Sequence, residues 1–303
     1  MKKLVFGSLN IDRTYTVEHF VSAGETISAE KMNIFCGGKG LNQAVAMSRA
    51  GSEVYFAGAI GADGDILLQA LQNERINIDC VKRTDGASGH AVIQVDKSGS
   101  NCIMILAGSN GEIGHADVDR VLSGFDSGDL VLLQNEISSL DYIISQAHKK
   151  GMKVALNPSP FNKAIERCEL SELDYLIVNE VEGAAICGES SWRAIIDSIR
   201  SSYPSVSILL TLGHRGSVYY DKDGAVETCG IYRVPVTDTT AAGDTFVGYF
   251  LTKILAGGSV SEALTTAATA SAIAVSRAGA LPSIPFAQEL KTADMILMVP
   301  FNG

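Results

Sequence analysis

A run of small residues between two carboxylates, from Asp238 to Asp244 (DTTAAGD), is the stretch best suited to chemistry. It lies between a segment expected to be extended, Tyr232 to Val236, and an apolar segment expected to be a helix. Residues as small as Ala242 and Gly243 leave the N–H groups at a helix start unshielded, and the helix dipole adds partial positive charge there. Phosphate binds at such places. The sequence therefore predicts an anion site in this turn.

Asp244 stands directly beside the predicted anion site. A carboxylate in this position can take a proton from a hydroxyl group that attacks the phosphate. The alternative is an ordinary carboxylate in a first helical turn, where it stabilises the helix through the dipole. The second carboxylate, Asp238, and the lack of bulky side chains favour a general base.

A glycine-rich motif, Gly37-Gly38-Lys39-Gly40, precedes a helix-like run that contains Asn42. Its spacing matches neither the phosphate loop nor the dinucleotide fingerprint. Its glycines allow the backbone to approach a ligand, while Lys39 and Asn42 offer hydrogen-bond donors to hydroxyl groups. A flexible turn before a helix is the alternative.

The motif Asn179-Glu180-Val181-Glu182 places an amide and a carboxylate after an apolar run. Glu182 is a candidate to hold a water molecule of a magnesium ion. A solvated carboxylate in the first helical turn explains the same residue equally well.

The whole chain fits one large α/β domain, because 303 residues with 46% hydrophobic and 19% charged residues can bury a sizeable core. The net charge is -10, from 24 basic and 34 acidic residues, without a Lys/Arg cluster. A nucleic-acid partner is therefore not expected. A polyphosphate ligand would need local N–H groups and a divalent metal to overcome the overall repulsion.

Six scattered cysteines without a C-x-x-C pair predict reduced thiols and a cytoplasmic location. The apolar run at the N-terminus stops at Gly7, too early for a signal peptide. No apolar run reaches the length that spans a membrane, so no membrane partner is expected.

Strand-like and helix-like runs alternate through the middle of the chain, which predicts an α/β layer fold around a mainly parallel sheet. The expected strands are 4–6, 130–133, 154–156, 175–178 and 208–212, and the expected helices are 41–50, 66–74, 139–150, 181–187 and 191–201. A capping box at Ser259 and Glu262 predicts one more helix, rich in alanine, over 263–277.

A second group of segments alternates polar and apolar residues, namely 14–17, 26–35, 90–96 and 101–106. Lys97-Ser98-Gly99-Ser100 joins the last two as a hairpin. Half-polar strands of this kind predict a small sheet apart from the main core. Its apolar face needs a cover, which is substrate, a second subunit, or both.

Polar residues or glycines follow the apolar strands, and ligands of parallel sheets bind at that edge. They are Asn10, Asp12, Gln134 to Glu136, Asn157, Asn179 to Glu182, Thr211, Gly213 and Gly216. Asn157, beside Pro158, is expected only to end its strand. The others predict a binding site at the carboxyl edge.

With these motifs established, the chain resembles the ribokinase-like carbohydrate kinases, the phosphofructokinase-B family, over nearly its whole length. The matching segments are GSLNID from Gly7, GGKGLNQAVA from Gly37, ALNPSP from Ala155, N-x-x-E from Asn179, LTLGHRG from Leu210, DTTAAGDTF from Asp238 and AIAVSRAGALPSIP from Ala272. The resemblance implies a single three-layer domain over 1–303 with a mainly parallel sheet. A small β-sheet lid would be drawn from about 11–36 and 88–107.

The activity that the resemblance implies is transfer of the ATP γ-phosphate to the primary hydroxyl of a pentose, D-ribose before others. Asp244 would be the base, and the amides of Ala242 and Gly243 would form the anion hole. The sugar would be held by Asn10, Asp12, Gly38, Lys39, Asn42, Glu136 and Asp244, and the nucleotide by Asn179, Thr211, Gly213, Gly216 and Gly243.

The resemblance also implies two cations and a second subunit. Mg²⁺ would lie near Glu182. K⁺ would be bound by Asp238, Thr240, Ala274, Arg277, Gly279 and Ser283, mostly through backbone carbonyls. Ala91 and Ile105 would cover the sugar, and the lids of two chains would pair into a homodimer.

Two departures from the family pattern leave the sugar open, namely Leu41 in the glycine motif and Arg13 after Asp12, and Ala268 near the expected adenine leaves the nucleotide preference open. Deoxyribose, fructose-type sugars and nucleosides are alternative acceptors. A sugar sensor without catalysis is a further alternative, which the intact Asp244 disfavours. A nicotinamide-dependent oxidoreductase is the weakest, because no G-x-G-x-x-G follows the first strand.

Overall fold

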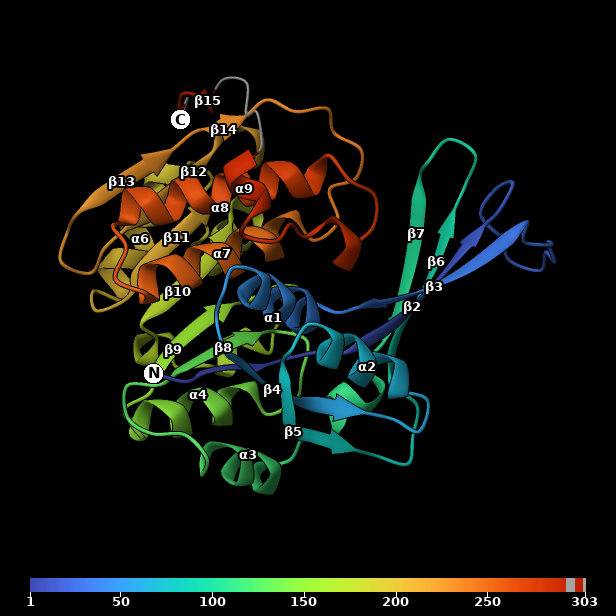
Figure 1. Ribbon diagram of the computed structural model, residues 1–303, viewed down its shortest axis with the longest axis horizontal. Coiled ribbons are helices and arrows are strands. Elements are labelled where there is room, and N and C mark those ends of the chain that lie inside the picture. The colour runs from blue at the N-terminus through green and yellow to red at the C-terminus, as the bar shows by residue number, and fades with distance from the viewer. Residues whose placement is uncertain (293–297, 302–303) are drawn as a thin grey trace.

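The structure, a computed structural model, describes residues 1–292 and 298–301. Its body is built on a nine-stranded sheet (Figure 1). In spatial order the strands are β13 (Val226–Cys229), β12 (Ser217–Tyr220), β11 (Ser207–Thr211), β10 (Tyr175–Asn179), β9 (Lys153–Asn157), β8 (Leu130–Gln134), β1 (Lys3–Phe6), β4 (Val54–Ile60) and β5 (Asn77–Arg83). The pairs from β11 to β5 are parallel, and β12 and β13 add an antiparallel edge.

Helices cover both faces of this sheet, which makes three layers (Figure 1). One face carries α3 (His115–Leu122), α4 (Leu140–Lys149), α5 (Glu180–Cys187) and α6 (Trp192–Ser202), and the other carries α1 (Lys39–Arg49), α2 (Asp65–Asn73), α7 (Ala242–Leu255) and α8 (Val260–Val275). Alternation along β1 shows why: Leu4 and Phe6 join one core and Val5 joins the other. The predicted three-layer α/β fold is confirmed.

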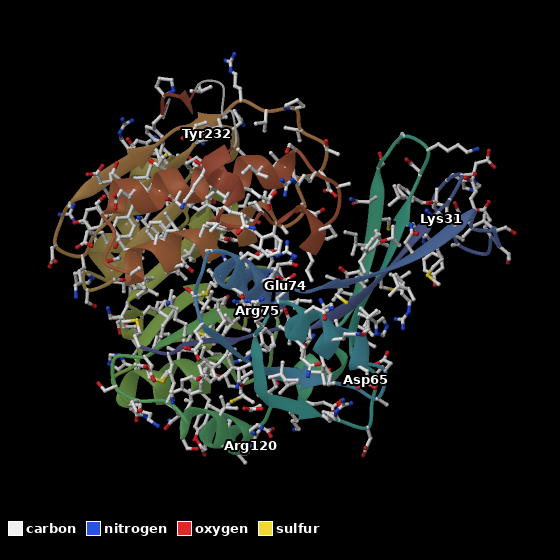
Figure 2. The ribbon with its side chains drawn as sticks, in the orientation of Figure 1. Lys31, Asp65, Glu74, Arg75, Arg120 and Tyr232 are labelled. Carbon is white, nitrogen blue, oxygen red and sulfur yellow. The ribbon has the colours of Figure 1, made fainter. Side chains whose placement is uncertain are left out.

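A separate four-stranded sheet, called the small sheet below, projects from the body (Figure 1). Its order is β3 (Lys31–Gly37), β2 (Asn10–Thr16), β6 (Gly89–Val95) and β7 (Asn101–Leu106). Lys31 lies on it, well away from the body (Figure 2). The predicted second sheet is therefore present, although residues 26–30, expected in a strand, precede β3.

The segment before the predicted anion site differs from its prediction. Only its first residue is in a strand, because β14 (Ile231–Tyr232) pairs with β15 (Met298–Val299) and residues 233–240 are irregular. Thr237 and Asp238 donate their N–H groups to the Val275 carbonyl, which ties this irregular segment to the end of α8. The run from Tyr232 to Val236 is thus a paired strand only at its first residue, and the tie to α8 holds the residues that follow it.

The helices α7 and α8 pack against each other, and α7 also packs against α1 (Figure 1). The predicted capping box is present at the start of α8, where Ser259 Oγ accepts from Glu262 N and Glu262 Oε2 accepts from Ser259 N. The start of α7 has no side-chain cap, and Ala241 before it is left-handed with φ 58°. Within the described residues, no helix combines the length and apolar character needed to cross a membrane.

Candidate active site

The glycine motif at the start of α1 is held against the loop after β1. The N–H of Lys39 donates to Glu136 Oε2 at 2.9 Å, and that of Gly40 donates to Ser8 Oγ at 3.2 Å. Ser8 Oγ in turn donates to Glu136. Gly38 has φ 97°, and a side chain there would come within 2.9 Å of the Ser8 carbonyl. The motif is thus a fixed part of the site and more than a flexible turn.

Asp244 lies in the first turn of α7 and is only 7% exposed. Two amides from α1 hold its carboxylate: Asn42 Nδ2 donates to Oδ2 at 3.0 Å, and Gln43 Nε2 donates to Oδ1 at 2.9 Å. The structure therefore joins the two predicted motifs through direct hydrogen bonds. Gln43 was not among the predicted site residues.

The start of α7 keeps backbone donors open, as predicted. Within the described chain, the N–H groups of Gly243 and Asp244 have no hydrogen-bond acceptor. A side chain added at Gly243 would meet nothing within 4 Å, so the space in front of it is open. The N–H of Ala242 instead donates to the Thr239 carbonyl at 3.3 Å. The open N–H groups are thus those of Gly243 and Asp244, one residue later than the predicted pair Ala242 and Gly243.

Charges converge around Lys39. The nearby Asp244 carboxylate raises the pKa of Lys39 most, and Glu136 and Glu182 add to this effect against the lowering by burial. Burial, and then the charge of Glu136, raise the pKa of Asp12 to about 6. Burial also raises the pKa of Glu136. The site therefore holds a firmly protonated amine among buried carboxylates.

Asn10, at the first position of β2, is buried and oriented by a residue that the sequence analysis missed. Asn110 Nδ2 donates to Asn10 Oδ1 at 2.8 Å, while the Asn110 amide also bonds the N–H and carbonyl of Leu9. This leaves the Nδ2 donors of Asn10 for other partners. No sequence signal marks Asn110, which lies 100 residues away from Asn10.

The predicted nucleotide residues lie at the ends of neighbouring strands. Asn179 of β10 and Thr211 of β11 are paired in register, and Gly213 and Gly216 follow in the turn after β11. Asn179 and Glu182 form a capping box at the start of α5. Glu182 is 5% exposed, so the alternative of a solvated carboxylate is wrong.

The residues predicted to bind K⁺ lie around one loop junction. Asp238 Oδ1 accepts from the N–H and hydroxyl of Thr240, and Oδ2 accepts from Gly279 N at 2.9 Å. Arg277 N donates to the Ala274 carbonyl at 3.0 Å in the same loop, while Ser283 follows in the next turn. Burial raises the pKa of Asp238, but these hydrogen bonds outweigh it and lower the pKa below its usual value. No hydrogen bond of the described chain joins Asp238 to Asp244.

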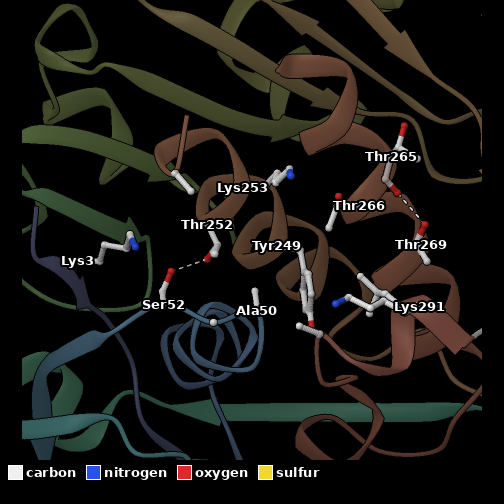
Figure 3. A pocket seen from close by; sticks show the side chains of 14 residues that line it. Lys3, Ala50, Ser52, Tyr249, Thr252, Lys253, Thr265, Thr266, Thr269 and Lys291 are labelled. Carbon is white, nitrogen blue, oxygen red and sulfur yellow. Dashed lines mark hydrogen bonds between the residues drawn. The ribbon is translucent and has the colours of Figure 1, made fainter. Parts of the chain in front are cut away.

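A cavity of about 460 Å³ lies elsewhere, at the carboxyl ends of α1 and α7 (Figure 3). Lys3, Lys253 and Lys291 are part of its lining, with hydroxyl groups such as that of Thr252. Carbonyl ends of helices carry partial negative charge, which these lysines complement. None of the predicted site residues lines this cavity. The candidate active site is therefore the open start of α7 and not this cavity.

A three-layer α/β body with a buried carboxylate and open N–H groups at the carboxyl edge of its sheet, beside a projecting small sheet, defines a small-molecule kinase. The chain belongs to the pfkB family of carbohydrate kinases, which it matches over residues 2–287.

Individual relatives agree with this assignment. The chain is 34% identical to a ribokinase of Schizosaccharomyces pombe, covering 93% of this chain and 94% of the relative. A ribokinase of Cryptococcus neoformans in complex with ADP superimposes with a TM-score of 0.84 at 32% identity, over 96% of this chain and 99% of that one. An Arabidopsis thaliana ribokinase complexed with ribose and ATP has a TM-score of 0.84 at 29% identity, over 96% and 97% of the two chains. The ribokinase-like fold is thus confirmed.

Proposed function

We propose that this protein transfers the γ-phosphate of ATP to the primary hydroxyl of a pentose, with D-ribose the preferred acceptor. The observation that carries the proposal is Asp244, buried and held by two amides beside the open N–H groups of α7. The similarity to ribokinases over nearly the whole chain supports the choice of sugar and nucleotide.

The reaction needs a base and an anion site, and α7 offers both. Asp244 accepts the proton of the sugar hydroxyl while that oxygen forms a bond to the γ-phosphorus. The bond between this phosphorus and the bridging oxygen of ADP breaks in the same transfer. The N–H groups of Gly243 and Asp244 stabilise the negative oxygens of the phosphoryl group, helped by the helix dipole.

The sugar is placed between α1, the loop after β1 and the small sheet. Asn42 donates to Asp244, while its Oδ1 is buried without a partner in the described chain and can accept from a sugar hydroxyl. Lys39 and the Nδ2 of Asn10 are donors, and Asp12 and Glu136 are acceptors. The backbone of Gly38 allows the sugar to come close.

The nucleotide side is formed by Asn179, Thr211, Gly213 and Gly216, with Mg²⁺ near Glu182. Within the described residues, no group of three or more acidic, His or Cys side chains is arranged to hold a metal. One carboxylate with waters and substrate phosphates is a common magnesium environment, so Glu182 fits this role. Bound Mg²⁺ would neutralise charge on the phosphate oxygens.

A monovalent cation fits the junction around Asp238. The lowered pKa keeps this carboxylate ionised, and backbone carbonyls of Thr240, Ala274, Arg277 and Gly279, with Ser283, supply the oxygen ligands that hard cations prefer. K⁺ therefore activates the enzyme in this proposal. Equal activity in potassium, sodium and tetramethylammonium salts would contradict it.

The small sheet acts as the lid of the sugar site. Strand register places Phe35, Asp12, Ala91 and Ile105 in one row across it, so they share a face. Ile105 and Met104 are 61% and 67% exposed, which supports pairing of two lids in a homodimer. Light scattering at working concentration tests this pairing.

Use of ATP and six unpaired cysteines support a cytoplasmic location. Localisation of a tagged copy in the cells of origin tests this part of the proposal.

The deciding experiment is ADP release from ATP and Mg²⁺ over D-ribose, 2-deoxyribose, fructose and nucleosides. We expect the highest kcat/KM with D-ribose. A higher value with another acceptor would move the specificity to that compound. Calorimetric binding of sugar without any ADP release would replace the kinase with a sugar sensor.

A further inference from the structure

A chain of buried amides leads from the centre of the main sheet to the Asp244 carboxylate. Gln43 Nε2 donates both to Asp244 Oδ1 at 2.9 Å and to Asn157 Oδ1 at 3.0 Å. Gln134 Nε2 donates to Gln43 Oε1 at 2.7 Å. Gln43 and Gln134 are fully buried, and Asn157 is 8% exposed. All the donors of Gln43 and its acceptor are thus engaged.

The sheet fixes where this chain begins. Gln134 ends β8 and Asn157 ends β9, and the two are paired in register. Each continues the side-chain alternation of its strand onto the face that α1 and α7 cover. Asn157 Nδ2 donates to the Ile177 carbonyl at 2.9 Å, so its Oδ1 is turned toward Gln43. The expectation that Asn157 only ends its strand is therefore wrong, because its side chain also accepts from Gln43 and donates to the Ile177 carbonyl.

These hydrogen bonds allow only one orientation of the Gln43 amide. A flipped amide would point its oxygen at Asp244 Oδ1 and Asn157 Oδ1, and its nitrogen at the Gln134 donor. Buried polar groups left without partners in this way are strongly disfavoured. Gln43 is consequently a rigid donor to one defined oxygen of Asp244.

We propose that Gln43, held by Gln134 and Asn157, is a positioning residue that aims the Asp244 carboxylate at the acceptor hydroxyl. Asn42 fixes one carboxylate oxygen and Gln43 fixes the other, so the carboxylate cannot rotate in the open space before Gly243. A catalytic group displaced by about 1 Å from its reactive position can react about 100-fold more slowly. This inference rests on the proposed kinase function.

The test is a mutant cycle with Gln43→Met, which keeps the length of the side chain and removes its polar atoms. We expect kcat to fall about 10- to 100-fold while KM for sugar and for ATP changes less than about twofold. In an Asp244→Ala background the same substitution should change the residual rate less than about twofold, because no carboxylate remains to be aimed. If Gln43→Met does not fold, Gln134→Met enters the same cycle.

Thr252→Val is the matched control, because it removes a buried hydroxyl of α7 that bonds Ser52 and does not touch Asp244. We expect unchanged kcat for it. Wild-type kcat in Gln43→Met, or an equal loss in the presence and absence of Asp244, would overturn the positioning role and leave the kinase assignment intact. A wild-type protein that releases no ADP with any acceptor would instead refute the proposed function and the positioning role together.

Discussion

The helices α7 and α8 pack side by side, yet their N-termini are built in opposite ways. At the start of α8, Ser259 and Glu262 satisfy each other's N–H groups in a capping box. At the start of α7, no side chain caps the helix, and the N–H groups of Gly243 and Asp244 have no acceptor in the described chain.

This contrast separates two roles of a helix N-terminus, which are to stabilise the helix and to bind an anion. Unsatisfied N–H groups destabilise a helix by amounts that a capping residue recovers, typically about 1 kcal/mol. The left-handed Ala241 adds strain of about 1 kcal/mol or more. A sequence selected only for stability would cap α7 as it caps α8. The open start of α7 is therefore best explained by an anionic ligand that supplies the missing acceptors.

The strongest test of this contrast is Asp244→Asn. We expect turnover to fall by roughly 10²-fold or more, because an amide cannot accept the hydroxyl proton. Sugar affinity should persist, since the other sugar contacts remain. ADP release and calorimetry measure the two quantities, and near-normal turnover would exclude Asp244 as the base.

The pair Gly243→Ala and Ser259→Ala tests whether only one of the two helix starts serves a ligand. At Gly243 the added methyl group meets no atom within 4 Å, so the fold accepts it. The methyl group would enter the proposed phosphate space and keep the phosphate away from N–H donors whose contribution to the transition state is large. We expect kcat/KM for ATP to fall about tenfold or more, with thermal stability equal or higher because alanine suits a helix better. An unchanged kcat/KM would place the phosphate elsewhere.

The difference between the two helix starts could be predicted in part from the sequence. The capping box at Ser259 and the bare turn before Asp244 are local patterns, and local patterns predicted both helix starts. Strands such as β4, with its run VYFAGAI, escaped notice because short apolar runs do not distinguish strand from helix. In the run from Tyr232 to Val236 only Tyr232 is in a strand, because its partner strand β15, distant in sequence, pairs with Ile231 and Tyr232 alone.

The site residues divide in the same way. Asn42 and Asp244 stand in recognisable motifs, so their types and spacing could be predicted. Gln43 and Asn110 act through partners about 100 or more residues away, and only the tertiary structure brings these pairs together. The residues next to Gln43 and Asn110 in the sequence do not indicate that these two amides belong to the site.

Asp12 of β2, away from both helix starts, is a buried carboxylate whose replacement by asparagine should change the pH dependence of stability. Burial raises the pKa of Asp12 to about 6, so the fold favours its protonated form. Its stabilising contribution is complete below the ordinary pKa of 3.8 and is lost as the pH rises through about 6.

Asparagine stays neutral at every pH. We therefore expect Asp12→Asn to gain about 1–3 kcal/mol over wild type at pH 8, and little at pH 3. Denaturant unfolding at both pH values measures the difference. An equal change at the two values would mean that Asp12 carries its charge in the fold without penalty.

Ser259→Ala changes the start of α8 alone, and of all these substitutions we expect it to have the smallest effect. It removes the hydroxyl that accepts from Glu262 N, far from any proposed ligand contact. We expect a loss of about 1 kcal/mol of stability, which lowers the melting temperature by about 2 °C in a chain of this size. Kinetic constants should stay at wild-type values, since none of the residues proposed to bind substrate lies at the start of α8. A loss of ATP affinity in this variant would show that the two helix starts are coupled through the packing of α7 on α8, and the division between a stabilising start and a binding start would then fail.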